Sequence, residues 1–469
     1  MLSVRFCDPA CSAPHSDSGR ERAPETANFP ALKGGTNKVL FLDCSARGLV
    51  AFPPSLLQLE HLEELHLEGN LIETLPSKIG LLRNLRVLYL QGNRLEHVCE
   101  ELGRLTQLLS LDLSGNPVAD GQRLLLEVVQ RLRGLRELRL HGLGLTDLPD
   151  RICKNLHSLE LLGLSANSLT TLPGAIVNLS HLREIYVQGN QLEVLPTGLG
   201  GLPRLEIVDA GQNLLAALPD GACGPTWRKL FLGSNRVSAL PGSLRKLGRL
   251  AVLDVSRNRL TGLPRCFSAL TSLVELDLSD NPLRTLPPQV CLLTSLQVLY
   301  LRNTQLRGLH PNLSNLQRMQ VLDLSQNRFS KFPSEIIHLK NLEQLSLDDT
   351  LKELRLQGNR LGRLPLNMTK LQALEVLLLE GNPLTDPPAG VCDQGPAAVR
   401  QYLEEKARVL TKAVQVQAWW RGVMVRRRLG PFASLGANEK GKRKQKKDKD
   451  RKKKPAAGNA KKGPARKKK

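Results

Sequence analysis

The sequence predicts an α/β fold, a solenoid of about 15 stacked coils whose short strands form a curved parallel sheet. Leucine recurs every few positions along most of the 469 residues, while aromatic residues make up only 3% of the chain. Asparagines follow one another at a spacing of 23 residues, as at Asn70, Asn93 and Asn116. The chain is also too long for one ordinary globular core, whereas stacked coils accommodate any length because each contacts only its neighbours.

Each coil follows the pattern LxxLxLxxNxLxxLP, as in LEELHLEGNLIETLP from Leu62, and this pattern is typical of leucine-rich repeats. We expect LxL to form a short strand whose leucines point inward, with the residue between them facing solvent. The asparagine should turn the chain and bind backbone groups of the neighbouring coil that would otherwise be buried unpaired. A loosely helical stretch such as SKIGLLRNL should return the chain along the convex side.

Two irregularities interrupt the period. The asparagine position moves 27 residues from Asn116 to Leu143, so ADGQRLLLEVVQRLRG predicts a longer, helical return. It moves only 9 residues from Thr350 to Asn359, where NLEQLSLDD runs directly into TLKELRLQGN. We interpret the region 347–356 as a junction at which part of a regular repeat is absent, through a splice form or a gene-model error.

The last repeat ends in a proline-rich segment. Pro387, Pro388 and the pair Gly395-Pro396 should stop the coil, and Pro396 is well placed at a helix start. The helix that follows should cap the open end of the solenoid with three side chains, which are Val399, Tyr402 and Leu403.

A candidate partner-binding surface is the column of residues between the two strand leucines, on the concave side. In order they are His66, Tyr89, Asp112, Arg139, Gly163, Tyr186, Asp209, Phe231, Asp254, Asp277, Tyr300, Asp323, Ser346, Arg355 and Leu378. Exposed aromatic residues often anchor protein interfaces, and aspartates favour a basic partner. We therefore assign partner binding to Tyr89, Asp112, Tyr186, Asp209, Phe231, Asp254, Asp277, Tyr300 and Asp323. LDLS is common in this repeat, so a purely structural role for the aspartates stays open.

Residues 411–430, TKAVQVQAWWRGVMVRRRLG, reproduce every position of the IQ pattern. Val416, Trp420 and Val423 recur at helical spacing and form one apolar stripe. EF-hand proteins take such stripes into an apolar groove with acidic rims. The predicted calmodulin-binding residues are Val416, Gln417, Trp420, Arg421, Gly422, Val423, Arg426 and Leu429. A basic helix packed on the solenoid end or lying on a membrane is the alternative, and calcium dependence stays open.

The charge is concentrated at one end of the chain. The net charge is +22, and residues 397–469 hold 25 basic and 5 acidic residues, so the rest of the chain is nearly neutral. We expect four parts: a disordered N-terminal arm at 1–36, the solenoid at 37–396, the capping and IQ helix at 397–430, and a disordered basic tail at 431–469. Such a tail could make nonspecific contacts with polyanions.

Several function classes find no support. The sequence has no phosphate-binding loop, no zinc-spaced His/Cys cluster and no nucleophile elbow. We therefore expect no enzyme, no cofactor, no metal and no small-molecule substrate. The nine scattered cysteines and the absence of a signal peptide or membrane span favour a reducing, cytosolic location.

The repeats together with the IQ helix resemble the leucine-rich repeat and IQ motif-containing proteins, over about 37–469. This resemblance implies a cytoplasmic adaptor with a calmodulin-type site, with a cytoskeletal, ciliary or nuclear location left open. Two alternatives also stay open. One is a structural protein anchored to microtubules or another polyanion through its tail. The other is a regulatory subunit that docks a phosphatase or small GTPase, which follows from fold analogy alone.

Overall fold

The computed structural model describes residues 39–118, 122–339 and 351–427, with the backbone alone at 421–427. The predicted N-terminal arm, the tail, Ser346 and Leu429 lie outside these residues.

The chain divides into two compact units, unit 1 up to Tyr186 and unit 2 from Val187. The described strands are parallel and number fifteen: β1 Phe41–Asp43, β2 Glu64–His66, β3 Val87–Tyr89, β4 Ser110–Asp112, β5 Glu137–Arg139, β6 Leu161–Gly163, β7 Glu184–Tyr186, β8 Ile207–Asp209, β9 Lys229–Phe231, β10 Val252–Asp254, β11 Glu275–Asp277, β12 Val298–Tyr300, β13 Val321–Asp323, β14 Glu353–Arg355 and β15 Val376–Leu378.

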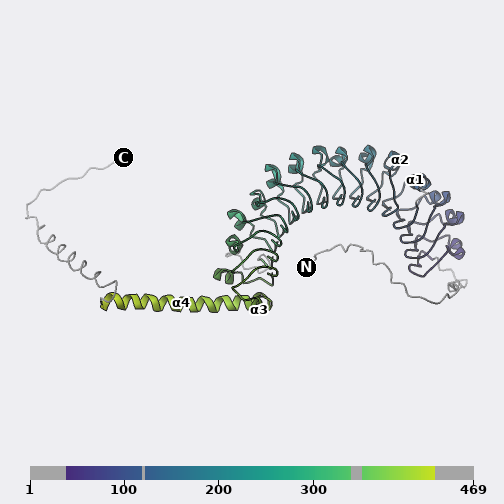
Figure 1. Cartoon of the computed structure of the whole chain (residues 1–469). Helices are drawn as coiled ribbons and strands as arrows, with labels where there is room; N and C mark the ends of the chain where they lie inside the picture. Colours follow the sequence, from purple (N-terminus) through teal and green to yellow (C-terminus); the bar gives the residue numbers. More distant parts are fainter. Residues whose placement is uncertain (1–38, 119–121, 340–350, 428–469) are drawn as a thin grey trace, which may run out of the picture. The chain divides into compact units, whose positions relative to one another are not determined.

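Within each unit the strands pair in sequence order, and Figure 1 shows the coils following one another. Equivalent repeat positions face each other across the register, as Leu65 pairs with Leu88 and Leu88 with Leu111. These leucines are completely buried. The predicted parallel sheet is confirmed, because only stacking at this register hides the inward leucines of every coil.

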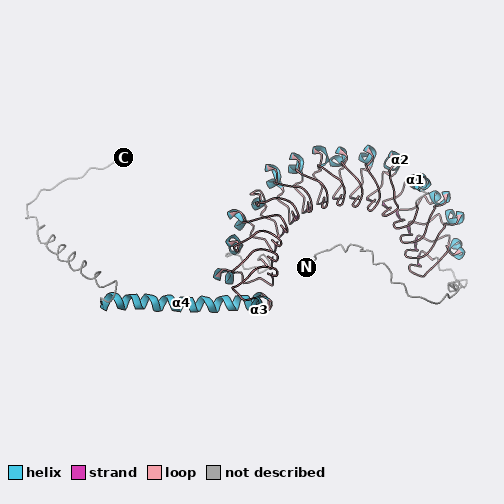
Figure 2. Cartoon of the chain, in the orientation of Figure 1, coloured by secondary structure: helices cyan, strands magenta, loops and turns pink. Residues whose placement is uncertain are grey.

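Short helices return the chain on the side of each coil opposite its strand (Figure 2). They begin directly after the proline of most LP pairs, since proline fixes φ and lacks the amide that a first turn leaves unpaired. The 3₁₀ turns are η1 Pro54–Gln58, η2 Ser77–Leu81, η3 Glu100–Arg104, η4 Gly174–Asn178, η5 Thr197–Gly201, η6 Asp220–Ala222, η7 Gly242–Lys246, η8 Arg265–Ala269, η9 Val290–Leu292, η10 Pro311–Asn315, η11 Ser334–His338 and η13 Leu366–Lys370. Two returns are α-helical, α1 Gln122–Val129 and α2 Asp150–Asn155. The longer return predicted after Asn116 is therefore helical.

The repeated asparagines are buried and bind the backbone between coils. The side-chain amide of Asn281 donates to the carbonyl of Val255 in the preceding coil at 2.9 Å and to that of Leu278 in its own coil at 3.0 Å. Its oxygen accepts from the amide of Leu260 at 2.9 Å. The same arrangement recurs at Asn70, Asn93, Asn116, Asn167, Asn213, Asn235, Asn258, Asn327, Asn359 and Asn382. The predicted structural role of these residues is confirmed.

The strands on either side of the irregular junction pair with each other. β13 pairs directly with β14, so that Val321 faces Glu353 and Asp323 faces Arg355. The column of described residues therefore passes directly from Asp323 to Arg355. The inward leucines Leu354, in β14, and Leu356, directly after it, are completely buried.

The last coil is covered by a long helix. α3 spans Ala389–Cys392, and α4 spans Pro396–Arg427 without a break. Val399 and Leu403 are 1% exposed and pack against η13, while the Tyr402 hydroxyl donates to the Asp386 carboxylate at 3.1 Å. The expected cap is thus present, with each of the three predicted side chains in contact.

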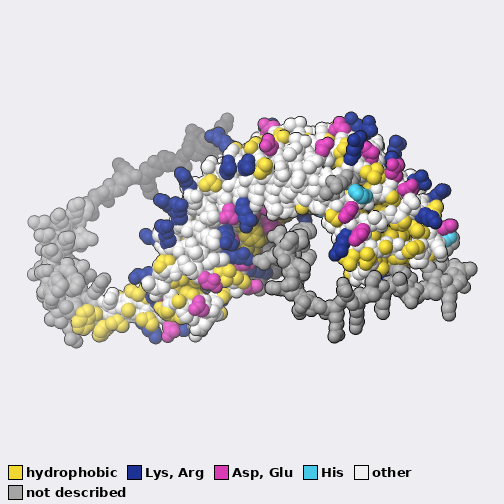
Figure 3. Space-filling model, turned by 45° about the vertical axis from the view of Figure 1, so that its right-hand side comes forward, with side chains coloured by type: hydrophobic (Ala, Val, Ile, Leu, Met, Phe, Trp, Pro, Cys, Tyr) yellow, Lys and Arg dark blue, Asp and Glu magenta, His cyan; other side chains and the backbone are white. Residues whose placement is uncertain are grey.

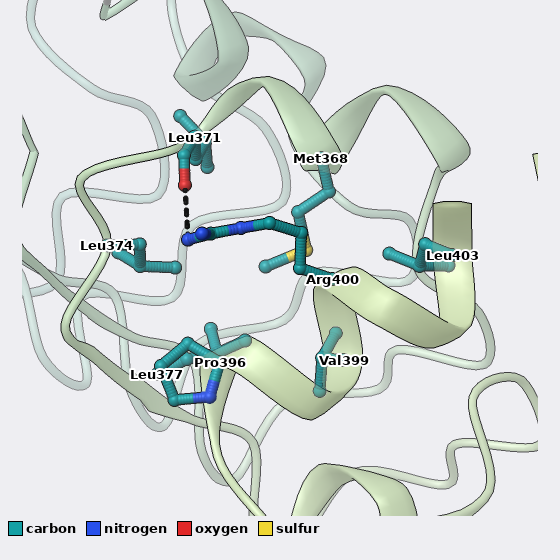
Figure 4. Close-up of a pocket in the computed structure, with 8 residues that line it drawn as sticks. All are labelled: Met368, Leu371, Leu374, Leu377, Pro396, Val399, Arg400 and Leu403. Carbon is teal, nitrogen blue, oxygen red and sulfur yellow. Dashed lines mark hydrogen bonds between the residues drawn. The ribbon is translucent and has the colours of Figure 1, made fainter. Parts of the chain in front are cut away.

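The contact between α4 and the last coil encloses a small, mostly apolar hollow. Figure 4 shows its lining, which comprises Met368, Leu371, Leu374, Leu377, Pro396, Val399, Arg400 and Leu403. The Arg400 guanidinium donates to the Leu371 carbonyl at 3.2 Å and closes one side. We assign this hollow to the cap, because the residues that line it are those that hold α4 on the coil.

Candidate functional site

The first candidate surface is the part of α4 beyond the cap. Residues 408–420 are all exposed, although many are apolar. The large apolar side chains there are Val409, Leu410, Val414, Val416, Trp419 and Trp420, and each is more than half exposed. Figure 3 shows hydrophobic side chains along this part of the chain. An exposed apolar surface of this kind is a candidate partner site, because single exposed residues are common but large apolar patches are not.

The predicted IQ residues lie at the far end of α4. Val416 is 62% and Trp420 54% exposed, and Gln417 between them is exposed as well. Arg421, Gly422, Val423 and Arg426 lie on the same helix, which continues through Arg427. The helix places Val416 and Trp420 one turn apart, as the predicted apolar stripe requires. Trp419 is equally exposed, but the IQ pattern assigns it no role.

The second candidate surface is the strand face, by which we mean the column of residues that end the strands. The register aligns His66, Tyr89, Asp112, Arg139, Gly163 and Tyr186 in unit 1. In unit 2 it aligns Asp209, Phe231, Asp254, Asp277, Tyr300, Asp323, Arg355 and Leu378. β1 adds Asp43 opposite His66, a position that the sequence-based column omitted.

The column aspartates have a structural task as well as a surface position. Asp254 and Asp277 each accept a hydrogen bond from the backbone amide two residues later, at 2.8 Å, and Asp112, Asp209 and Asp323 do the same. Asp112 and Asp323 are less than 10% exposed. This local bond explains why LDLS is common in the repeat, since the carboxylate satisfies an amide at the end of each strand. The side chains of Asp112 and Asp323 are therefore less accessible to a partner than the sequence suggested.

The strand face of unit 2 crowds acidic groups together. Burial, and next to it the charge of Asp254, raise the pKa of Asp277 to about 7. Burial also raises the pKa of Asp209, and burial with the charge of Asp254 raises that of Glu275. At the end of this stretch the guanidinium of Arg355 lies 3.8 Å from the Asp323 carboxylate. A cation from a partner placed beside Asp277 would relieve the repulsion that these carboxylates impose on one another.

We predict that Asp277→Asn stabilises the protein at pH 8 but much less at pH 5. The folded-state pKa of Asp277 lies above its ordinary value of 3.8, so the folded chain binds a proton that the unfolded chain releases. Stability is therefore lost as pH rises from 3.8 towards about 7, and little more is lost above that. The stability difference between variant and parent should grow by on the order of 2 kcal/mol between pH 5 and pH 8. Urea unfolding at both pH values measures it.

The matched control for this prediction is Asp112→Asn. Asp112 occupies the same repeat position and makes the same backbone bond, but its neighbour across the register is Arg139. Removing its charge relieves no carboxylate repulsion of that kind. An equal gain in stability at pH 8 in both variants would show that the neighbouring carboxylates do not destabilise the charged form of Asp277.

Unit 1 presents an aromatic run that the sequence interpretation missed in part. The rings of Phe41 and His66 lie 5.2 Å apart, and those of His66 and Tyr89 lie 4.8 Å apart. Phe41 is 53% exposed. It escaped notice because it stands at the start of its strand, two residues before the column position, and only the fold brings its ring against His66. Tyr186, farther along the unit, donates to Glu184 at 2.8 Å.

The described residues give little support for a metal site, a membrane-spanning helix or a reactive cysteine. Within them, no group of three or more His, Cys, Asp or Glu side chains could hold a metal ion. No helix of the described ranges has the length and apolar character needed to cross a membrane. The cysteines of these ranges are free, and burial raises the pKa of the Cys153 thiol to about 12.

Comparison with known families agrees with the fold. The family model for the leucine rich repeat matches residues 60–118, 133–192, 225–283 and 294–351, which together make up half of the chain. The chain is a leucine-rich repeat protein. Members of this class are typical protein-binding scaffolds, since stacked coils present an extended surface.

This leucine-rich repeat protein is similar to the mouse and human proteins named leucine-rich repeat and IQ domain-containing protein 4. The identity is 48% over 153 residues with the mouse protein and 43% over 152 residues with the human one. The alignments span 33% and 32% of this chain, but only 25% and 27% of the relatives. The resemblance inferred from the repeats and the IQ helix is thereby confirmed for about a third of the chain.

Solved structures show the same solenoid. A leucine-rich repeat protein of Leptospira interrogans is 26% identical and superimposes with a TM-score of 0.55, covering 78% of this chain and 94% of its own. The Arabidopsis receptor kinase HAESA, solved with the peptide hormone IDA and a co-receptor, is 26% identical with a TM-score of 0.53. That match covers 74% of this chain and 62% of the receptor chain.

Proposed function

We propose that this leucine-rich repeat protein is a non-enzymatic adaptor. In this proposal α4 binds calmodulin or a calmodulin-like EF-hand protein, and the strand face binds a second protein. The observation that carries the proposal is the exposure of Val416 and Trp420, which stand on a helix whose other end is held firmly by the cap. An unbroken helix of this kind presents its apolar side chains in a fixed arrangement, which lowers the entropic cost of binding.

Charge supports an acidic partner. Between Lys406 and Arg428 the sequence holds seven basic residues and no acidic one. EF-hand proteins combine apolar grooves with acidic rims, so both features of this segment find a counterpart. The name of the mouse and human relatives also refers to an IQ domain. A location in the cytoplasm, where calmodulin is found, belongs to the same proposal.

The strand face supports the second half of the proposal. Carboxylates crowd around Asp277, and Tyr300 stands beside it in the register. A partner segment with one or more basic residues would bring positive charge to these groups and place apolar atoms against Tyr300. The related receptor HAESA was solved with a peptide hormone, so the same fold holds a peptide in that protein.

The test is a calorimetric titration of the full chain with calmodulin, with calcium and with chelator. We expect micromolar or tighter binding in at least one condition. The variant Val416→Ala/Trp420→Ala should weaken it by about a hundredfold or more, because both side chains lose most of the apolar surface that binding would bury. Thr411→Ala/Gln415→Ala, on the polar side of the same helix, should bind like the parent.

No binding in either condition would refute the α4 half of the proposal. Binding that Val416→Ala/Trp420→Ala leaves unchanged would place calmodulin elsewhere on the chain. The ratio of the affinities with and without calcium shows whether binding depends on calcium, a point that the sequence left open.

A further inference from the structure

The IQ pattern accounts for only part of the exposed apolar surface of α4. It assigns Val416 and Trp420, but Leu410 and Val414 are also 54% and 57% exposed. They lie before the motif, between it and the cap. Fraying at a helix end does not explain their exposure, because α4 continues beyond them to Arg427.

Leu410 and Val414 continue the helix face that the cap uses. Counting from Val399, the residues Leu403, Leu410 and Val414 follow at intervals of 4, 7 and 4, which return to the same side of an α-helix. Val399 and Leu403 are 1% exposed because the last coil covers them. The coil ends before Leu410, so the same face emerges uncovered.

The apolar IQ side chains Val416 and Trp420 lie on a different face. At 100° per residue, Val416 and Trp420 stand roughly 120° around the helix from Leu410 and Val414. Val409 is 62% exposed and belongs to the side of Val416, seven residues earlier. The exposed apolar side chains thus extend over more than half of the circumference, whereas a groove that takes a helix covers only one side of it.

We propose that the EF-hand partner of α4 grips the helix with two separate apolar surfaces. One lobe takes the Val416/Trp420 face, and the second lobe takes the Leu410/Val414 face, next to the cap. The second lobe would then lie close to the last coil, since Leu410 follows the buried Leu403 by seven residues, or about 10 Å of helix. This inference rests on the proposed function.

The test compares Leu410→Gln/Val414→Gln with Thr411→Ala/Gln415→Ala in the full chain. Glutamine keeps a good helix propensity, and all four parent side chains are exposed, so neither variant should alter the fold. Circular dichroism checks the helix content of both. We expect the first variant to bind intact calmodulin at least about tenfold more weakly, through the loss of the second apolar contact, and the second variant to bind normally.

Isolated calmodulin lobes distinguish a clamp from a groove. The parent chain should bind two isolated lobes at once, and Leu410→Gln/Val414→Gln should remove one of these two sites. Unchanged affinity of this variant for intact calmodulin would overturn the two-surface inference, and the adaptor proposal would survive if Val416→Ala/Trp420→Ala still weakened binding. Analytical ultracentrifugation provides a further check. If the parent forms dimers and only Leu410→Gln/Val414→Gln is monomeric, this face binds a second copy of the chain, which would overturn the inference.

Discussion

Replacing Asn281 with alanine is expected to lower the local stability of its coil by about 3 to 4 kcal/mol. The side chain is 1% exposed and binds the carbonyls of Val255 and Leu278 and the amide of Leu260. Alanine leaves the Leu278 carbonyl and the Leu260 amide buried without these partners, while the Val255 carbonyl keeps only the bond from the Asn258 side chain at 3.1 Å. Urea unfolding together with hydrogen exchange of the peptides around 255–283 measures the loss.

The repeat itself provides the control, Asn281→Thr. Threonine already occupies the equivalent position in the next coil, where the Thr304 hydroxyl donates to the Leu301 carbonyl at 2.7 Å. There the Leu283 amide turns to the Asn281 carbonyl of its own coil at 2.9 Å instead of reaching a side chain in the next one. Asn281→Thr should therefore lose less stability than Asn281→Ala, because the hydrogen bond to the Leu278 carbonyl is kept.

Hydrogen exchange is the more informative readout for this pair of variants. The stability of a stacked repeat is a sum of local terms, so a lost asparagine should loosen its own coil and its neighbours more than distant coils. Faster exchange spread evenly over all coils would contradict this view. A loss below about 1 kcal/mol would show that the ladder of asparagines is not what satisfies these backbone groups.

The second large effect is expected for Gly200→Ala, which should destabilise the protein by about 3 kcal/mol. A methyl group on Gly200 would stand 2.4 Å from the Gly221 carbonyl oxygen and 2.6 Å from that of Cys223. Both are backbone atoms of the next return, in η6 and directly after it, and a backbone atom cannot rotate away as the end of a side chain could. The next coil, which carries Gly221 and Cys223, is one residue short, with Asn235 following Asn213 after 22 positions.

The neighbouring residue, Gly201, provides a closely matched control. Gly201 belongs to the same turn, and a methyl group there would meet nothing within 4 Å. Gly201→Ala should be neutral or stabilise by about 0.5 kcal/mol, since alanine restricts the unfolded chain. Thermal and urea unfolding of both variants measure the difference. Equal stabilities would mean that the returns of these two coils lie farther apart than the structure places them.

Much of the fold could be predicted because the repeat is local. The pattern around Leu62–Asn70 specifies a strand, a turn and a return within one coil, and the next coil repeats it in register. The helix after Asn116 and the cap by Val399 and Leu403 followed from spacing and from the proline before the helix. The strand predicted through Ser346 lies outside the described residues, and the direct pairing of β13 with β14 could not be read from the period alone.

The candidate sites divide in the same way. The IQ pattern of the sequence identified Val416 and Trp420, and the structure adds that they are exposed on a helix anchored at its other end. Leu410 and Val414 could not be recognised from the sequence as exposed, since they occupy the same helix face as the buried cap residues. Only the position where the last coil ends separates the two pairs.

By itself, the sequence determined the repeat, its register, the role of the asparagines and the location of the basic helix, because each depends on contacts between residues at a constant separation. Tertiary structure alone decided the direct pairing of β13 with β14, the crowding that raises the pKa of Asp277, the close approach at Gly200 and the exposure of Leu410. These features arise between coils, where the distance between two groups depends on how neighbouring returns and strands stack. No local pattern encodes that distance.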